Sequence, residues 1–256
     1  MKRFFIGICL LLAATAPAAE MGHFDPLARS WTVTTDFWQC TFVEGSMNPG
    51  CFRFRDNRFA GAIVFQDALT DETKTKFFYL SQERWAESTV LRNDADAFVI
   101  ELRGGFWNNQ STTIMPFPEV SATYRYEFRR DSHVIRIHCR LRKPRGKAVF
   151  IYCSGCPGWL YEHPFRCITA NGKTESFDLG GKTGRWATRS WDARESITLE
   201  APDFLVTVTA PRVIAGLRPD FCYPVILIFG AWRHAWEPNS TELDFAGTVD
   251  LQPLRK

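Results

Sequence analysis

Between Ala122 and Arg142 the chain alternates strictly between apolar and polar residues, which predicts two half-buried strands. The first run places Ala, Tyr, Tyr and Phe at every second position, and the second run places Ile, Ile, Cys and Leu in the same way. A polar turn around Asp131 and Ser132 separates the two runs. The pattern therefore predicts a β-hairpin with one face in the core and one face in water.

The alternation also predicts the register of this hairpin. A slip by one residue would carry arginines into the core, so only one register suits the pattern. We expect Tyr126 to face Ile137 in the core. On the wet face we expect two further cross-strand pairs: Glu127 with Arg136, and Arg125 with His138.

Further segments are short, rich in β-branched and aromatic residues, and bounded by Gly, Pro, Asn or Asp. No window of eleven or more residues shows a helical stripe with caps. We therefore expect an all-β chain that forms a large antiparallel β-sandwich with few or no helices. The segments are Phe52–Arg55, Ala62–Gln66, Lys76–Leu80, Phe98–Arg103, Ala148–Cys153, Ser196–Glu200, Phe204–Ala210, Val225–Gly230 and Leu243–Leu251.

The stretch Tyr124–Pro144, YRYEFRRDSHVIRIHCRLRKP, resembles a pattern of the galactose-mutarotase-like sandwiches. In that pattern an aromatic strand ends in an Arg-Asp turn and leads into an alternating Ile/Val strand. The resemblance implies a many-stranded supersandwich that acts on or binds carbohydrate. It covers this stretch alone, and it assigns none of the family's catalytic histidines or glutamate to a residue of this chain.

The N-terminal residues 1–18 have the pattern of a secretory signal peptide. Lys2 and Arg3 precede an apolar run from Phe4 to Leu12, and Ala16-Pro17-Ala18 supplies a small-residue cleavage motif. The longest later apolar run, Val225–Trp232, is far shorter than the roughly twenty residues that cross a membrane as a helix. We expect a single β-sandwich domain over residues 19–256, periplasmic or secreted, without a membrane span.

Charge gives little indication of a partner. The chain has 31 basic and 28 acidic residues, and loss of Lys2 and Arg3 with the signal would leave it nearly neutral. This balance gives no reason to expect nucleic acid as a partner. No motif identifies a reaction or a cofactor, so we expect no cofactor and leave open whether the chain is an enzyme.

Seven cysteines remain after the signal peptide, an odd number. Cys40 and Cys51 flank a turn-rich loop and are predicted to form a disulfide. Alternation places Cys139 in the core as a thiol. A further group of cysteines with one histidine combines the ligand types of a zinc site. Because disulfides are commoner in exported proteins, we predict no metal there. The disulfide connectivity of these cysteines and of Cys222 stays open. That group is Cys153, Cys156, His163 and Cys167.

The segment from Trp232 to Glu237 places two indoles among Arg, His and Glu. Sugar rings present apolar C–H faces and a rim of hydroxyls, so a sugar site needs flat aromatic groups beside polar ones. We expect Trp232 and Trp236, with Trp107 from a second such loop, to stack on sugar while Arg233 bonds hydroxyls. The alternative is that these indoles fill the end of the sandwich and their polar neighbours are solvated.

Three residues are candidate catalytic groups. His234 and Glu237 would form a proton-transfer pair at neutral pH if the fold brings them together, and His138 is a further candidate base. An enzyme would require one of these histidines within hydrogen-bonding reach of a carboxylate or a tyrosine inside a cleft.

The wet face of the predicted hairpin has a local excess of positive charge. Arg125, Arg136 and Arg140 are candidate ligand-binding residues there, because arginines recognise carboxylates and sulfates in bidentate fashion. Such a face would select an acidic glycan. The alternative is a solvated outer face with Glu127 as a partial neutraliser.

The sequence thus favours an exported carbohydrate-binding or carbohydrate-processing β-sandwich protein, with an acidic glycan as the finer expectation. The competing hypothesis is a non-catalytic structural or assembly protein of the cell envelope that binds other proteins. A cleft lined by the tryptophans would favour sugar, and a flat apolar patch would favour a protein partner. The identity of the glycan, catalytic turnover and oligomeric state do not follow from the sequence.

If the signal peptide is cleaved, the mature chain begins at Ala19, because Ala16 and Ala18 occupy the two small-residue positions before the cut. Mass spectrometry of the exported protein measures this directly. Retention of Met1 would remove the basis for an extracytoplasmic location.

Overall fold

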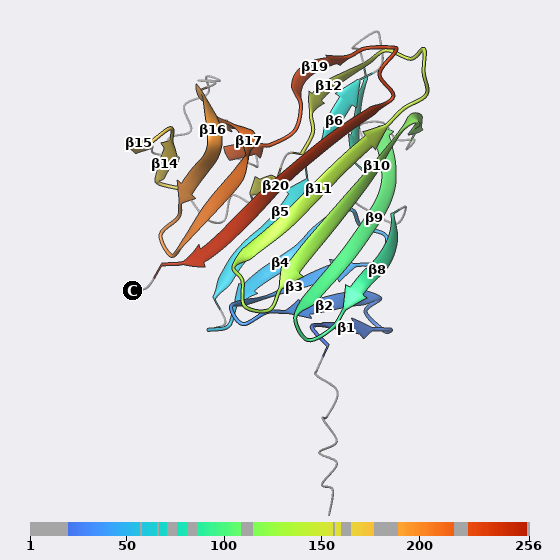
Figure 1. Cartoon of the computed structure of the whole chain (residues 1–256). Coiled ribbons are helices and arrows are strands. Elements are labelled where there is room, and N and C mark those ends of the chain that lie inside the picture. Colours follow the sequence, from blue (N-terminus) through green and yellow to red (C-terminus); the bar gives the residue numbers. More distant parts are fainter. Residues whose placement is uncertain are drawn as a thin grey trace, which may run out of the picture.

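The computed structural model describes residues 20–56, 58–65, 67–70, 76–80, 86–108, 115–155, 157–159, 165–176, 189–217 and 225–254. This part of the chain contains strands and no helix, so the all-β prediction is confirmed (Figure 1). Accordingly, none of the described residues belongs to a long apolar helix of the kind that crosses a membrane. Every strand pairing is antiparallel.

The strands are β1 (Gly22–Asp25), β2 (Ser30–Thr34), β3 (Trp38–Val43), β4 (Pro49–Phe54), β5 (Phe59–Phe65), β6 (Ala68–Thr70), β7 (Phe77–Leu80), β8 (Glu87–Asn93), β9 (Ala97–Asn108), β10 (Met115–Arg129), β11 (Val134–Arg142), β12 (Val149–Cys153), β13 (Pro157–Trp159), β14 (Cys167–Ala170), β15 (Lys173–Ser176), β16 (Arg189–Glu200), β17 (Phe204–Leu217), β18 (Val225–Ile228), β19 (Trp232–Trp236) and β20 (Glu242–Pro253).

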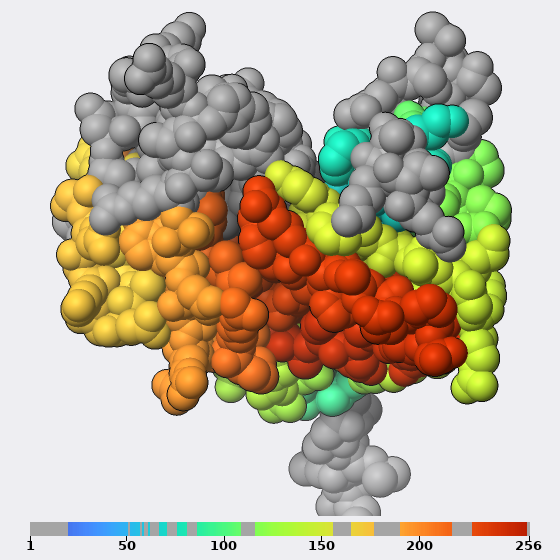
Figure 2. All heavy atoms as spheres, turned by 90° about the horizontal axis from the view of Figure 1, so that it is seen from above, coloured from blue at the N-terminus to red at the C-terminus, as the bar shows by residue number. Residues whose placement is uncertain are grey.

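The smaller sheet is a meander in which β1, β2, β3, β4 and β5 each pair with the next strand. The larger sheet has the order β8-β9-β10-β11-β20-β17-β16-β14-β15. Figure 1 shows this long sheet in front of the meander, and Figure 2 shows β20 (red) with β16 and β17 (orange) on one side and β10 and β11 (yellow-green) on the other.

Two branches leave the larger sheet. At its C-terminal end β9 pairs with β7, and from β7 the ladder continues through β6 and β12 to β19. At the end of β17, β18 pairs and leads through β13 to β5, which joins the two sheets. The first branch carries the aromatic side chains described below.

The core lies between the meander and the larger sheet. The Trp38 ring of β3 packs edge-on against Phe128 of β10, with 5.4 Å between ring centroids. The Phe42 ring of β3 lies 5.4 Å from the Tyr126 ring of β10, and the two rings are tilted relative to one another. Aromatic contacts from one sheet to the other are the packing that a sandwich requires, because each sheet buries its apolar face against its partner.

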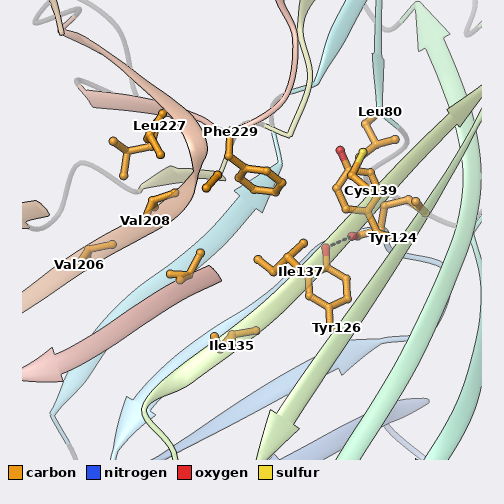
Figure 3. Close-up of a cluster of buried hydrophobic side chains, with 14 of the residues drawn as sticks. Leu80, Tyr124, Tyr126, Ile135, Ile137, Cys139, Val206, Val208, Leu227 and Phe229 are labelled. Atoms are coloured by element: carbon orange, nitrogen blue, oxygen red, sulfur yellow. Dashed lines mark hydrogen bonds between the residues drawn. The ribbon is translucent and has the colours of Figure 1, made fainter. Parts of the chain in front are cut away.

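The β10–β11 hairpin has the register that the alternation predicts. Tyr126 pairs with Ile137 and both side chains are buried, whereas Arg125 pairs with His138 on the wet face. Cys139 is buried beside them, as expected for a core thiol (Figure 3).

A polar group is enclosed in this core. The buried Asp67 carboxylate accepts hydrogen bonds from the Tyr124 hydroxyl and from the backbone N–H of Gly155, the latter at 3.0 Å. Burial, and then the charge of Asp67, raise the pKa of the Tyr124 phenol well above its usual range. The same two causes raise the pKa of the Cys139 thiol. Both groups therefore stay protonated at neutral pH.

The predicted Cys40–Cys51 disulfide is not tested by this structure. Cys40 is buried and stands opposite Phe52 in the β3–β4 ladder. The side chain of Cys51 lies outside the described residues, so the disulfide remains a prediction.

Replacing Ile137 with Ala should lower the free energy of unfolding by about 2–4 kcal/mol, because it leaves a cavity in a packed core. His138→Ala, at the neighbouring half-exposed position, should cost much less. Urea unfolding of the two variants measures both. Equal losses would contradict the observed register.

Tyr124→Phe should lower the free energy of unfolding by about 1–3 kcal/mol, because it removes one of the donors to a buried carboxylate. Tyr152→Phe is the matched control, since its hydroxyl belongs to a half-buried ring and should matter by less than about 0.5 kcal/mol. Thermal and urea unfolding of both variants test this; similar losses would show that Asp67 does not depend on Tyr124.

Candidate functional site

The first branch of the sheet brings the two predicted tryptophan segments onto one cross-strand line. Trp107 of β9 stands opposite Tyr79 of β7, Tyr79 opposite Ala68 of β6, Ala68 opposite Cys153 of β12, and Cys153 opposite Trp232 of β19. With about 4.8 Å between neighbouring strands, the two tryptophans lie roughly 19 Å apart. The predicted grouping of Trp107 with Trp232 thus has a structural basis in the ladder.

A second apolar cluster lies on the face of this branch that points away from the main core. Ala68 belongs to this cluster while its neighbour Leu69 belongs to the main core, and Ile228 and Leu227 divide in the same way. Adjacent residues of a strand point to opposite faces, so the two clusters lie on opposite sides of the sheet. We call this group the outer-face cluster: Ala68, Cys153, Ile214 and Ile228, with Tyr79, Tyr152 and Trp232 packed against it.

Half-buried rings follow one another over the outer-face cluster. Phe77 lies 6.4 Å from Tyr79 and 5.6 Å from Tyr152, and Tyr152 lies 5.6 Å from Trp232, measured between ring centroids. Strands β12 and β19, which carry Tyr152 and Trp232, lie beside β6 at the top of Figure 1. These residues form what we call the aromatic row: Trp107, Tyr79, Phe77, Tyr152 and Trp232.

Arg233 lies at the β19 end of the row in an unusual backbone conformation. Its φ of 46° is in the left-handed region, which a long side chain rarely adopts and which costs of order 1–3 kcal/mol. Its guanidinium carbon lies 5.4 Å from the Trp232 ring centroid and 5.9 Å from that of Tyr152. The arginine is exposed, so its N–H groups are available beside two aromatic faces.

Trp236 does not join the row. Its side chain is 1% exposed and packs in the main core, and its indole N–H donates to Ser240 Oγ at 3.2 Å. A regular strand would place residues 232 and 236 on the same face, but the left-handed Arg233 interrupts the alternation between them. Its burial argues against stacking on sugar and favours the alternative, in which this indole fills the end of the sandwich.

The structure does not bring the candidate proton-transfer pair together. His234 and Glu237 are both exposed, and within the described part of the chain no hydrogen bond or ion pair joins them. His138 does have an acidic partner: its Nε2 lies in hydrogen-bonding contact with Asp244 Oδ1 of β20. Of the candidate catalytic residues, His138 alone lies beside a carboxylate among the residues that are described.

The basic face of β10 and β11 is largely neutralised. Arg136 Nη1 lies 2.9 Å from Glu127 Oε1, and Arg140 Nη2 lies 3.2 Å from Asp244 Oδ2. Two of the three candidate ligand-binding arginines are thus engaged in exposed ion pairs, which favours the solvated-face alternative for them. Arg125, the third, has no ion pair among the described residues.

Arg125 and His138 line an open groove of about 330 Å³ on this face. Strands β10, β11, β17 and β20 form it, and its other lining residues are Glu127, Arg136, Ile137, Thr209, Ala246, Gly247 and Thr248. The groove and the aromatic row are separate surfaces with no lining residue in common.

Sequence reasoning missed Phe77, Tyr79, Tyr152 and Asp244. The first three had a signal, because Lys76–Leu80 contains three consecutive aromatic residues and Ala148–Cys153 alternates aromatic with aliphatic residues, and both segments are predicted as strands. Asp244 had none, because nothing local places β20 beside β11.

The cysteine group around residue 153 is only partly described. Cys153 is buried in the outer-face cluster and Cys167 is half-exposed, while Cys156 and His163 lie outside the described residues. Among the residues that are described, no group of His, Cys, Asp and Glu side chains has the arrangement of a metal site.

No protein-family model matches the chain, and no curated protein is recognisably similar to it in sequence. Solved structures with a similar fold exist. The galactosidase domain of an alpha-galactosidase-sucrose kinase is 9% identical, with a TM-score of 0.60 over 91% of this chain and 41% of that chain. An alpha-mannosidase from Enterococcus faecalis is 9% identical, with a TM-score of 0.59 over 92% of this chain and 30% of that chain.

A galactose mutarotase-related enzyme from Lactobacillus acidophilus is 11% identical, with a TM-score of 0.47 over 87% of this chain and 97% of that chain. The chain spans less than half the length of the two larger proteins. The expected resemblance to mutarotase-like, carbohydrate-active sandwiches is thus confirmed for the fold.

Proposed function

We propose that this is a carbohydrate-binding β-sandwich protein whose ligand lies along the aromatic row. The observation that carries the proposal is the row itself: rings from β9, β7, β12 and β19 on one outer face, with Arg233 at its end. Sugars pack their C–H faces on such rings, and their hydroxyls need donors such as Arg233 beside them.

The dimensions of the row suit a chain of sugars better than a single one. Its end members are roughly 19 Å apart by strand spacing. The half-buried rings rest on the outer-face cluster, so little conformational entropy would be lost when a ligand packs on them. A preformed, extended platform therefore favours an oligosaccharide or polysaccharide.

The folds that resemble this chain support the ligand class. The two larger proteins are, by their names, a galactosidase domain and a mannosidase, which are proteins that process sugars. Since the likeness is one of fold, it raises the expectation of carbohydrate and leaves the residues to be argued from this chain alone.

The finer parts of the proposal concern location and ligand charge. We place the protein outside the cytoplasm, periplasmic or secreted, on the signal pattern of residues 1–18. We also propose that the glycan is acidic, because the groove face has Arg125 in addition to its ion-paired arginines.

The alternative is a structural or assembly protein of the envelope that contacts another protein through the same rings. The exposed Arg233 and His234 at the end of the row are compatible with the polar rim of such an interface. A glycan-array screen of the mature protein separates the two hypotheses.

Trp232→Ala should weaken binding of a glycan found in that screen by at least about tenfold, because it removes the terminal platform of the row. Its melting temperature should fall by only a few degrees, since the ring is half-exposed. Trp236→Ala is the matched control: a buried indole is lost, so that variant should be strongly destabilised, by about 3–5 kcal/mol. Calorimetry and thermal unfolding measure both.

Arg233→Gly gives a second, independent variant. Glycine adopts φ of 46° without strain, so the melting temperature should stay the same or rise while glycan affinity falls. Unchanged affinity in folded Trp232→Ala and Arg233→Gly proteins would refute the aromatic row as the site.

A further inference from the structure

The groove on the β10–β11–β20 face arises from one short side chain. Across these strands the register places Arg125, His138 and Ala246 in one line. The next line contains Glu127, Arg136 and Thr248. Ala246 is exposed and lies where its neighbours are long, which leaves a depression with the β20 backbone as its floor.

One wall of the groove comes from the point where β17 leaves β20. Thr209 opposite Thr248 is the final pair of that ladder, and β17 then continues with β16 and β18. Both threonines line the groove, and no hydrogen bond to either hydroxyl is present among the described residues. Neither hydroxyl is therefore taken up by a protein partner in the described part of the chain.

Among the described residues, the ion pairs around the groove leave one positively charged side chain without an acidic partner. Glu127 is engaged by Arg129 and Arg136, and Asp244 by His138 and Arg140. Glu242 is engaged by Arg140 and Arg142, and Glu101, which stands opposite Arg125 in β9, is engaged by Arg103. Asp250 of the same face accepts a hydrogen bond from the Gln252 side chain.

Arg125 has no acidic partner in the described part of the chain. The groove is thus a largely apolar hollow with an unpaired guanidinium at its edge. A ligand carboxylate would find the bidentate donor there that the protein's own acids do not occupy.

We infer that this groove binds a hexuronate, a sugar ring with one carboxylate. Arg125 receives the carboxylate in bidentate fashion, the Thr209 and Thr248 hydroxyls bond ring hydroxyls, and the C–H face of the ring rests over Ala246. The inference depends on the proposed function for the class of ligand, a glycan. It concerns a different surface from the aromatic row, so an experiment can refute one of the two sites and leave the other in place.

The test is an NMR titration of the mature full-length protein with glucuronate, galacturonate, glucose and sodium sulfate. At least one hexuronate should bind at least about tenfold more tightly than glucose and sulfate, because only it combines a carboxylate with ring hydroxyls. Arg125→Gln should weaken that binding at least about tenfold. Ala246→Leu should do the same by filling the hollow, and, being at an exposed site, should leave the melting temperature near that of the wild type.

Arg142→Gln is the matched control. It removes the same charge from the same face, but Arg142 is paired with Glu242 and does not line the groove, so hexuronate binding should be unchanged. A similar loss in Arg125→Gln and Arg142→Gln, or equal binding of sulfate, would mean general attraction of anions and would overturn the inference.

The outcomes also separate this site from the aromatic row. Hexuronate binding lost in Trp232→Ala and retained in Arg125→Gln would refute the groove and leave the proposed function in place. Hexuronate binding lost in Arg125→Gln, together with unchanged glycan binding in Trp232→Ala, would refute the row and leave the groove.

Discussion

The burial of one carboxylate, that of Asp67, constrains the part of the fold that carries the aromatic row. A charge enclosed in a core is tolerated only where donors surround it, so the partners of Asp67 must be in place whenever the protein is folded. They come from distant segments: the Tyr124 hydroxyl of β10 and the Gly155 N–H that follows β12. The Asp67 carbonyl also accepts from the Leu80 N–H at the end of β7. Asp67 thus links the branch β7-β6-β12 to the main sheet in addition to the β7–β9 ladder.

That branch is what allows aromatic residues on an outer face. Most of the outer surface of the larger sheet is charged, but behind β6, β12 and β18 a second apolar cluster forms, and the rings rest on it. Because Arg233 takes a left-handed conformation, Trp232 faces this cluster while Trp236 faces the core. One strand thereby stabilises the sandwich with one indole and presents the other at its surface.

The groove is distinguished by the charges around it, not by a second apolar cluster beneath it. Arginines in β10 and β11 and acids in β20 neutralise one another across the sheet, which is worth little to stability at an exposed surface but leaves few charges without a partner. Because its neighbouring arginines are ion-paired, Arg125 is a distinct candidate binding residue: it has no ion pair among the described residues and lies in line with the short Ala246. In our proposals the aromatic row binds the apolar faces of sugars, whereas the groove binds a carboxylate.

The sequence by itself determined what depends on neighbouring residues. Strict alternation predicted the all-β class, the β10–β11 register and the burial of Cys139, since a one-residue slip would bury arginines. It also singled out Trp107, Trp232 and Arg233. Only the tertiary structure decided which of these lie together. The pairing of His138 with Asp244 and the line from Trp107 to Trp232 join strands distant in sequence, and the opposite facing of Trp232 and Trp236 results from one backbone angle. Alternation reports which face a residue takes within its own strand, whereas the neighbour across the ladder is chosen by how the whole sheet buries its apolar surface.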